Sequence, residues 1–333
     1  MATINNSLWS LADVVKRTNP DGSPVTQMVE TLTRRNPILE DVAWMEGNLP
    51  TGHRFASRTG LPAVGWRRFN EGVSPGKSVV DQIDETCGML EGMSVVDTAL
   101  VELNGTGAAF RASEDAAFLQ SFNNEVSTGL FYHSSKTAPE KFMGLSPRFD
   151  STTTSLAGPN IVIGDASASG ADQTSIWFVT WGPDSVFGIY PKGMGGGLSM
   201  EDLGKQIWDD GTGKKYTVYV TKWNWRLGLV VKDWRQVVRI ANVDTSALTS
   251  DGATGTKLID KMIDAYYKLD NPGAGRLVIY CNRTIGAFLH KQAMAKTSYQ
   301  LSLSEYNGRP ITTFLGYPIR VTDAILSTEA AIS

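Results

Sequence analysis

The sequence has few of the residues that build metal sites and disulfide frameworks. Its 333 residues include two cysteines and three histidines. Cys87 and Cys281 lie far apart and outside any CxxC spacing, which gives neither a disulfide framework nor a thiolate metal site and is typical of a reducing compartment. None of His53, His133 and His290 has a second histidine, cysteine or carboxylate at ligand spacing. We therefore expect no metal and no cofactor.

Long hydrophobic runs are also missing. No stretch of about 18 apolar residues occurs, which is the length that a membrane-spanning helix needs. The start, MATINNSLWSLADVVKRTNPDG, lacks the basic segment and the apolar stretch of a signal peptide. We therefore expect synthesis in a cytosol, no export by that route and no membrane partner.

Positive charge is not in excess either. The formal net charge is -3, whereas a dedicated nucleic-acid-binding protein usually carries a clear basic excess. Hydrophobic residues make up 41% of the chain and charged residues 20%, which is typical of globular proteins and disfavours general disorder. This balance still leaves room for a local basic patch.

Catalytic and phosphate-binding motifs are missing as well. GTGKKY at 211–216 lacks the first glycine and the hydroxyl residue of a P-loop, and GMGGG at 193–197 lacks the GxGxxG spacing. No GxSxG nucleophile elbow occurs. DDGTGKK at 209–215 lacks the alternating ligands of a calcium loop, so we interpret it as a hairpin turn. We expect no enzymatic activity, and we interpret neighbouring acids such as Glu201 and Asp202 as solvated.

What is present predicts an α+β fold. The strongest helix covers about 110–131, where apolar residues recur at every fourth position. These residues are Phe118, Phe122, Val126 and Leu130. The chain becomes β-rich from residue 174, with the strand candidates TSIWFVTW, SVFGIYP, KYTVYVTKW, RLGLVVKD and RQVVRIANV. A helix at 256–269, a buried strand, a further helix and a pair of strands around Asn307 and Gly308 complete the pattern.

One stretch, GHRFASRTGLPAVGWRRFNEG at 52–72, differs from the acidic background. It interleaves arginines with aromatic residues and has its first carboxylate near its end. The residues that we single out as subunit contacts are Arg54, Arg58, Trp66, Arg67, Arg68, Phe69 and Glu71. The strand-like pieces 52–59 and 63–70 predict a long two-stranded excursion with too few apolar residues for a core of its own. Strand alternation would place the side chains of Arg67 and Arg68 on opposite faces.

Residue type alone leaves several interpretations of this stretch open, because arginine binds phosphate and carboxylate groups alike. It is a nucleic-acid surface, a hairpin with solubilising charges, or an arm that fits another copy of the chain. The two-faced pattern favours the arm, for which the acidic segments DQIDE at 81–85 and ASEDAA at 112–117 are candidate partners. The nine tryptophans and the acid pairs raise a carbohydrate-binding or hydrolytic β-rich protein as a further alternative.

Taken in order, the pieces of the sequence resemble the major capsid proteins of tailed bacteriophages. The resemblance lies in the order of segments spread over most of the chain and not in a single fingerprint. These segments are GLPAVGWRRFNEGV, VVDTAL, RASEDAAFLQSFNNEV, GLFYH, KFMGLSPRF, TSIWFVTWGPDSVFGIYP, GLVVKDWRQVVRIANVD and FLGYPIRVTDAILSTE.

The resemblance implies the Johnson fold of these capsid proteins, with an N-terminal arm, an extended hairpin called the E-loop, a peripheral domain that carries a spine helix, and an axial domain. Carried over, the arm is 1–46, the E-loop 47–97, the peripheral domain 98–141 and 211–241 with the spine helix at about 110–131, and the axial domain mainly 142–210 and 242–333. The apolar stripe of the spine helix is then a core contact, and the arginine–aromatic stretch contacts neighbouring subunits.

The resemblance also implies partners. Copies of the chain would close into the pentamers and hexamers of an icosahedral virion capsid, assembled in the cytoplasm of a bacterial host, which encloses double-stranded DNA without sequence preference. About fifty residues precede the E-loop, where many relatives carry a large scaffolding segment, so we expect a separate scaffolding protein, a portal and, in some capsids, a decoration protein. Lys77 is the only lysine of the E-loop region, and we expect no covalent cross-link. The shell protein of a cell-encoded nanocompartment shares the fold and stays an alternative.

Overall fold

The structure is a computed structural model. It describes residues 36–102, 107–165, 172–209, 212–246, 248, 258–294, 301–306 and 309–332. Most of the predicted arm at 1–46 lies outside these residues, as does the turn at Asn307 and Gly308.

The described chain is a mixture of helices and strands, as the sequence predicted. The helices are α2 (Ile38–Asp41), α3 (Thr98–Glu102), α4 (Gly107–Tyr132), α5 (Leu258–Lys268) and α6 (Arg283–Met294), with the short 3-10 turns η1 (Ser146–Arg148), η2 (Gly158–Asn160) and η3 (Trp234–Gln236). The strands are β1 (Trp44–Glu46), β2 (Gly52–Gly60), β3 (Val79–Thr86), β4 (Gly88–Asp97), β5 (Ile161–Ile163), β6 (Gln173–Trp181), β7 (Val186–Tyr190), β8 (Ser199–Asp209), β9 (Lys215–Val231), β10 (Val237–Asp244), β11 (Arg276–Cys281), β12 (Leu301–Tyr306), β13 (Arg309–Phe314) and β14 (Tyr317–Val321).

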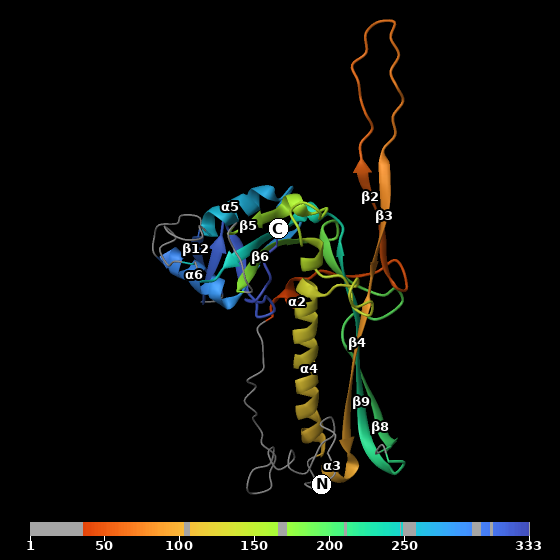
Figure 1. The fold of residues 1–333 in the computed structure, drawn as a ribbon. Coiled ribbons are helices and arrows are strands. Elements are labelled where there is room, and N and C mark those ends of the chain that lie inside the picture. The colour runs from red at the N-terminus through yellow and green to blue at the C-terminus, as the bar shows by residue number, and fades with distance from the viewer. Residues whose placement is uncertain are drawn as a thin grey trace.

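Three parts are visible in the ribbon (Figure 1). A compact body contains α5, α6 and the strands around β6, and the long helix α4 descends from it beside the ribbon of β4, β9 and β8. The hairpin of β2 and β3 extends away from the body in the opposite direction (Figure 1). The strands of the body and the ribbon form one sheet in the order β12-β13-β14-β11-β6-β7-β9-β4. Off this path, β10 pairs with β6, β5 with β10, β1 with β7 and β8 with β9.

The body is organised around β6, whose residues are all buried. Because successive side chains of a strand point to opposite faces, β6 serves two apolar cores. Ile176 and Phe178 belong to the core that includes Leu258 and Met262 of α5. Trp177 lies in the second core, which includes the end of α4. This explains why TSIWFVTW reads as an unbroken apolar run and not as an alternating strand.

The strand β9 joins the ribbon to the body. Its first part pairs with β4 and β8, and its last residues, 228–231, pair antiparallel with β7. The sequence predicted two strands here, KYTVYVTKW and RLGLVVKD, and they form one continuous strand. The segment 209–215 that we interpreted as a hairpin turn joins β8 to β9, since Asp209 pairs with Lys215.

The helix α4 packs against β4 through the predicted apolar stripe. Phe122, Val126 and Leu130 are buried, and Phe118 is half-buried. A Cβ atom at Gly92 of β4 would lie 3.0 Å from a ring atom of Phe122 and 3.2 Å from one of Phe118, so the absence of a side chain there sets the approach of the helix. The observed helix extends three residues before and one beyond the predicted 110–131.

Two segments differ from the secondary structure or pairing that the sequence predicted. Residues 63–70, predicted as a strand, have no regular structure up to residue 68 and a turn at Phe69 and Asn70, because no second strand pairs with them. The two-stranded hairpin ends at Thr86, and residues 88–97 pair with β9 instead. The hairpin is therefore shorter than the 47–97 that we expected, and its last predicted segment lies in the ribbon.

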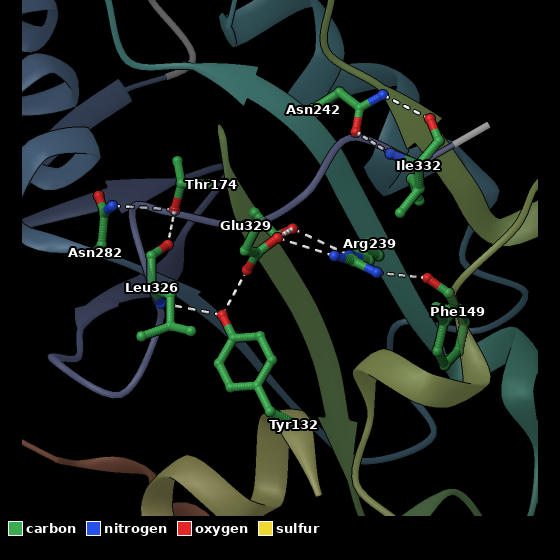
Figure 2. A network of polar contacts seen from close by, with 10 residues as sticks. Tyr132, Phe149, Thr174, Arg239, Asn242, Asn282, Leu326, Glu329 and Ile332 are labelled. Carbon is green, nitrogen blue, oxygen red and sulfur yellow. Dashed lines mark hydrogen bonds and ion pairs between the residues drawn. The ribbon is translucent and has the colours of Figure 1, made fainter. Parts of the chain in front are cut away.

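A buried polar network fixes the C-terminal segment across the body (Figure 2). Arg239 of β10 places a guanidinium nitrogen 2.9 Å from Glu329 Oε2 and donates a second hydrogen bond to the carbonyl of Phe149 at 2.6 Å. The hydroxyl of Tyr132, at the end of α4, donates to Glu329 Oε1 at 2.5 Å and accepts from the amide of Leu326 at 3.0 Å. Burial, followed by the neighbouring Glu329 carboxylate, raises the pKa of Tyr132 well above its ordinary value. The network thus connects α4, the sheet and the chain end.

Candidate interaction surfaces

The hairpin strands are held together by charge as well as by the backbone ladder. β2 and β3 run antiparallel, with Arg54 opposite Asp84 in the register. The guanidinium of Arg54 donates two hydrogen bonds to the Asp84 carboxylate, at 2.5 and 2.6 Å. The hydrogen bond from Arg54 holds the pKa of Asp84 below its usual range. The acidic segment 81–85 therefore finds an arginine of the predicted stretch within the same chain.

The root of the hairpin is fastened to the body. The ring of Phe55 is buried with Phe187, Ile189 and Val230 in a small apolar cluster. On the other strand, the buried Glu85 forms a two-pronged ion pair with Arg148, with 2.8 Å between Nη2 and Oε2. Such a bidentate pair fixes direction as well as distance. The pairing of Glu85 with Arg148 was not predicted, because the two residues lie 63 positions apart in the sequence.

The tip of the hairpin, residues 61–78, is exposed almost throughout. Relative exposure reaches 106% for Trp66, 100% for Phe69 and 93% for Val64, so these residues are almost fully exposed to solvent. The Asn70 backbone adopts a left-handed conformation with φ of 69°, and the Glu71 amide donates to the Arg68 carbonyl at 3.3 Å, which closes a turn. The tip is therefore an irregular loop that carries aromatic residues on the outside.

The predicted contact residues divide into three places. Arg54 lies in β2 and is paired, whereas Arg58 lies exposed near the end of the same strand. The others gather in the tip, and these are Trp66, Arg67, Arg68, Phe69 and Glu71. Within the part of the chain that the structure describes, Arg58, Arg67, Arg68 and Glu71 form no ion pair. Arg67 and Arg68 were predicted to point to opposite faces of a strand, and this prediction was wrong because neither residue lies in a strand.

A second exposed element is the strand β8, which the sequence analysis did not select. It pairs with β9 on one side, and among the described strands none pairs with its other edge. Nine of its eleven residues are exposed, including Met200, Leu203 and Ile207, the last with 73% relative exposure. The strand also carries Glu201, Asp202 and Asp209 against the single Lys205. A long free edge with apolar side chains is a template for pairing with another chain.

The charged side chains of β8 are partly held by α4 and α3. Arg111 of α4 lies 2.8 Å from the carboxylate of Asp202 and stacks 5.0 Å from the ring centre of Tyr219. The hydrogen bond from Arg111 lowers the pKa of Asp202. Lys205 reaches Glu102 of α3 at 3.3 Å. These contacts fix the ribbon against the helix and leave the free edge of β8 open.

The described residues include no arrangement suited to metal chemistry or thiol reactivity. No group of three or more histidine, cysteine, aspartate or glutamate side chains within the described ranges has the geometry to hold a metal ion. Burial raises the pKa of Cys87 to about 11 and that of Cys281 to about 12, so both stay thiols at neutral pH. None of the described helices is long and apolar enough to cross a membrane.

Comparison with known proteins identifies the family of the chain. A family model described as "Major capsid protein GP7" matches residues 19–333. A chain of the solved structure of bacteriophage Epsilon15 is 39% identical and superposes with a TM-score of 0.82, covering 100% of this chain and 99% of that one. No curated protein sequence matches the chain.

More distant solved structures match parts of the chain. A chain of the bacteriophage JBD30 capsid is 9% identical with a TM-score of 0.48, covering 78% of this chain and 83% of that one. A chain of the SrpI encapsulin complex from Synechococcus elongatus is 11% identical with a TM-score of 0.43, covering 71% and 97% respectively. The match over nearly the whole chain carries the assignment: this protein belongs to the family of the major capsid protein GP7 and is a structural protein of a tailed-phage capsid.

Proposed function

We propose that copies of this chain close into the pentamers and hexamers of an icosahedral shell, and that the tip of the β2–β3 hairpin is the arm by which each copy contacts its neighbour. One observation carries the proposal, which is the full exposure of Trp66 and Phe69 at the end of a hairpin that extends beyond the body (Figure 1). Large apolar groups gathered at an exposed place mark an interaction site.

The exposed apolar side chains of the tip would stabilise such a contact when the neighbouring copy buries them. Burying one large apolar side chain contributes roughly 1.5–3 kcal/mol, and the tip offers several. The tip also carries a net positive charge, since it contains Arg67, Arg68 and Lys77 but only one carboxylate, Glu71. The tip therefore suits a surface that combines apolar side chains with carboxylates.

The free edge of β8 has that composition and is the surface that we propose for the tip or strands of a neighbouring hairpin. It is apolar and net acidic, and the hairpin and β8 lie at opposite ends of the molecule (Figure 1). The two surfaces are too far apart to meet within one copy. A contact between two different patches of identical chains is heterologous and closes into rings when the rotation fits.

We propose that the three parts of the chain correspond to the domains of a capsid protein. The hairpin with its tip is the E-loop, α4 is the spine helix of a peripheral domain that includes the ribbon of β4, β9 and β8, and the body around β6 is the axial domain. The sheet pairing supports placing β4 and β8 in the peripheral domain, since both pair with the same strand.

We further propose that assembly needs a separate scaffolding protein and a portal. The shell would enclose double-stranded DNA through contacts to the phosphate backbone, without sequence preference and without catalysis. The contents of the particle separate this proposal from a nanocompartment shell, which encloses a protein cargo.

The experiment is electron microscopy of the protein expressed alone and together with the other virion genes, followed by analysis of the particles' contents. Shells or capsomer rings that enclose nuclease-protected double-stranded DNA support the proposal. Shells that contain only a protein cargo would favour the nanocompartment. A monomer that persists under every condition and binds DNA with a steep salt dependence would favour a nucleic-acid-binding module.

A further inference from the structure

We propose that the root of the β2–β3 hairpin is a pH-sensitive hinge in which His53 and His133 are the sensing groups. The hinge would control the orientation of the hairpin relative to the body. The importance of this control for assembly rests on the function proposed above. The chain has three histidines, and two of them lie beside this root.

The first histidine closes a small cluster at the end of α4. Nε2 of His133 lies 3.1 Å from Oε1 of Glu125, which also accepts a hydrogen bond from Lys141 Nζ at 3.2 Å. Lys141 Nζ lies 3.4 Å from the same ring nitrogen. The ring stands edge-on to Phe142 at 5.4 Å and packs over Gly129, where a Cβ atom would lie 2.5 Å from Nδ1.

This cluster is in contact with the joint of the hairpin. Gly88 begins β4 directly after the hairpin strand β3, and a Cβ atom there would lie 3.1 Å from the carbonyl oxygen of Glu140. The cluster and the joint share a cavity of about 110 Å³. Its lining includes Gly88, Leu90, Glu125, His133, Lys141 and Phe142. A movement of the loop at 140–142 would therefore change the packing around Gly88, where the hairpin meets the ribbon.

The second histidine lies within the hairpin root itself. His53 of β2 is opposite Glu85 of β3 in the register. Its ring stands edge-on to Phe187 of the body, with 5.5 Å between the ring centres. Its neighbour Glu85 is already paired with Arg148, and the cation Lys232 is paired with Asp184 at 2.5 Å. His53 therefore has no free carboxylate within this set to stabilise a charged ring.

Both rings lack a partner for a second proton. Within the described part of the chain, Nδ1 of His53 and Nδ1 of His133 are buried and make no hydrogen bond. A neutral His133 donates from Nε2 to Glu125 and keeps Nδ1 as a bare acceptor, whereas the protonated ring buries a donor with no acceptor. A buried donor without a partner costs about 1–3 kcal/mol, so protonation opposes the closed root.

The electrostatic environment acts in the same direction. Burial, followed by the nearby Lys141, lowers the pKa of His133, although Glu125 opposes the shift. Burial, followed by Lys232, lowers the pKa of His53. A lowered folded-state pKa means that the stabilisation of the root is complete above about pH 6.5 and is lost as the pH falls through the folded values. Mild acid should therefore loosen the hairpin while the rest of the molecule stays folded.

Hydrogen exchange of the full chain at pH 7.5 and 5.5, corrected for intrinsic exchange and held in one assembly state, tests this hinge. We expect the peptides that cover 48–60 and 79–90 to lose about tenfold protection at the lower pH, while the buried strand 276–281 changes less than twofold. The double variant His53→Gln with His133→Gln keeps two polar side chains that do not titrate, and it should change less than twofold in all three. His290→Gln is the matched control and should behave as the wild type.

Equal protection of the root at both pH values, or the same loss in the double variant, would overturn the hinge. If the double variant does not fold, a full pH series on the wild type decides, since a midpoint between about 5 and 6.5 indicates histidine and a midpoint below about 4.5 indicates carboxylates and contradicts the proposal. Exchange reports on the chain itself, so a chain that builds no shell would refute the proposed function and leave this result standing.

Discussion

At the residue scale, one glycine sets how closely the long helix lies on the ribbon. Gly92 of β4 faces Phe118 and Phe122 of α4, at distances that already place a single Cβ atom in tight contact. Aromatic rings that pack on bare backbone bury both partners without a gap, which is how interiors reach their usual density. The apolar stripe predicted a buried helix face, but not which residue it would meet.

Replacing Gly92 with valine should therefore destabilise the chain. The added methyl groups would overlap the two rings and force α4 away from β4, an overpacking that costs about 1–3 kcal/mol. Urea unfolding followed by circular dichroism measures the change. The control is Gly65→Val in the tip, where a Cβ atom has no neighbour within 4 Å and stability should stay within about 0.5 kcal/mol. Equal effects of the two variants would contradict this packing.

The ion pair of Arg239 and Glu329 is the second decisive contact at this scale. Both side chains are buried, with relative exposures of 4% and 6%, so neither charge has water to replace its partner. Removing one partner of a buried pair costs about 3–5 kcal/mol, whereas replacing both with apolar groups is often neutral.

Arg239→Met alone should accordingly lower the free energy of unfolding by about 3–5 kcal/mol. Arg239→Met combined with Glu329→Leu should recover part of the loss, because no charge is then left buried although the hydroxyls of Tyr132 and Ser175 lose their acceptor. A double-mutant cycle by chemical denaturation measures the coupling. A single variant as stable as the wild type would mean that the network in Figure 2 does not hold the C-terminal segment in place.

At the element scale, the structure contains two elements that the fold itself does not need. The hairpin tip and the free edge of β8 bury little within the chain, whereas most β strands of the body are buried on both faces. A strand of eleven residues with an unpaired edge is a liability unless something covers it. The simplest account is that other copies cover both elements.

If β8 is an interface, Ile207→Glu should weaken assembly without unfolding the subunit. The side chain is 73% exposed, so the change should alter the free energy of unfolding by less than about 0.5 kcal/mol. Light scattering against protein concentration would measure the assembly threshold, which should rise about tenfold or more. Leu156→Glu, at a position with 71% exposure outside β8, is the control and should leave the threshold unchanged.

The elements that could be predicted from the sequence are those that local patterns determine. The helix at 110–131 and the strands near 174–190 were predicted because periodicity and apolar runs are local properties. The strand at 63–70 was predicted wrongly, since Val64, Trp66 and Phe69 favour strands but find no pairing partner. The pairing of β4 with β9 was missed because its register, such as Val95 opposite Val220, joins residues more than a hundred positions apart. Glu201 and Asp202, interpreted as solvated, are exposed, and the contact of Asp202 with Arg111 of α4 was not predicted because the two residues lie far apart in the sequence.

At the scale of the whole molecule, the shape places one surface at each end. The cationic, aromatic tip extends from one end, and the acidic, apolar edge of β8 lies near the other (Figure 1). The tip and the edge of β8 cannot meet within one copy. In a ring the tip of each copy contacts β8 of the next copy, and the same contact is repeated around the ring. A slightly acidic net charge of -3 is compatible with this, since the cationic groups are local to the tip.

The central claim is that the tip acts between subunits, and charge reversal at Arg67 and Arg68 tests it most directly. Both arginines are exposed and, among the described residues, unpaired, so Arg67→Glu with Arg68→Glu should leave helix content and melting temperature unchanged. Lys136→Glu with Lys192→Glu, at exposed positions away from the tip, makes the same change in net charge. The measurement is the yield of shells by electron microscopy at matched concentration. We predict few or no shells from the arginine variant and normal shells from the lysine variant. Normal shells from both variants would contradict the account.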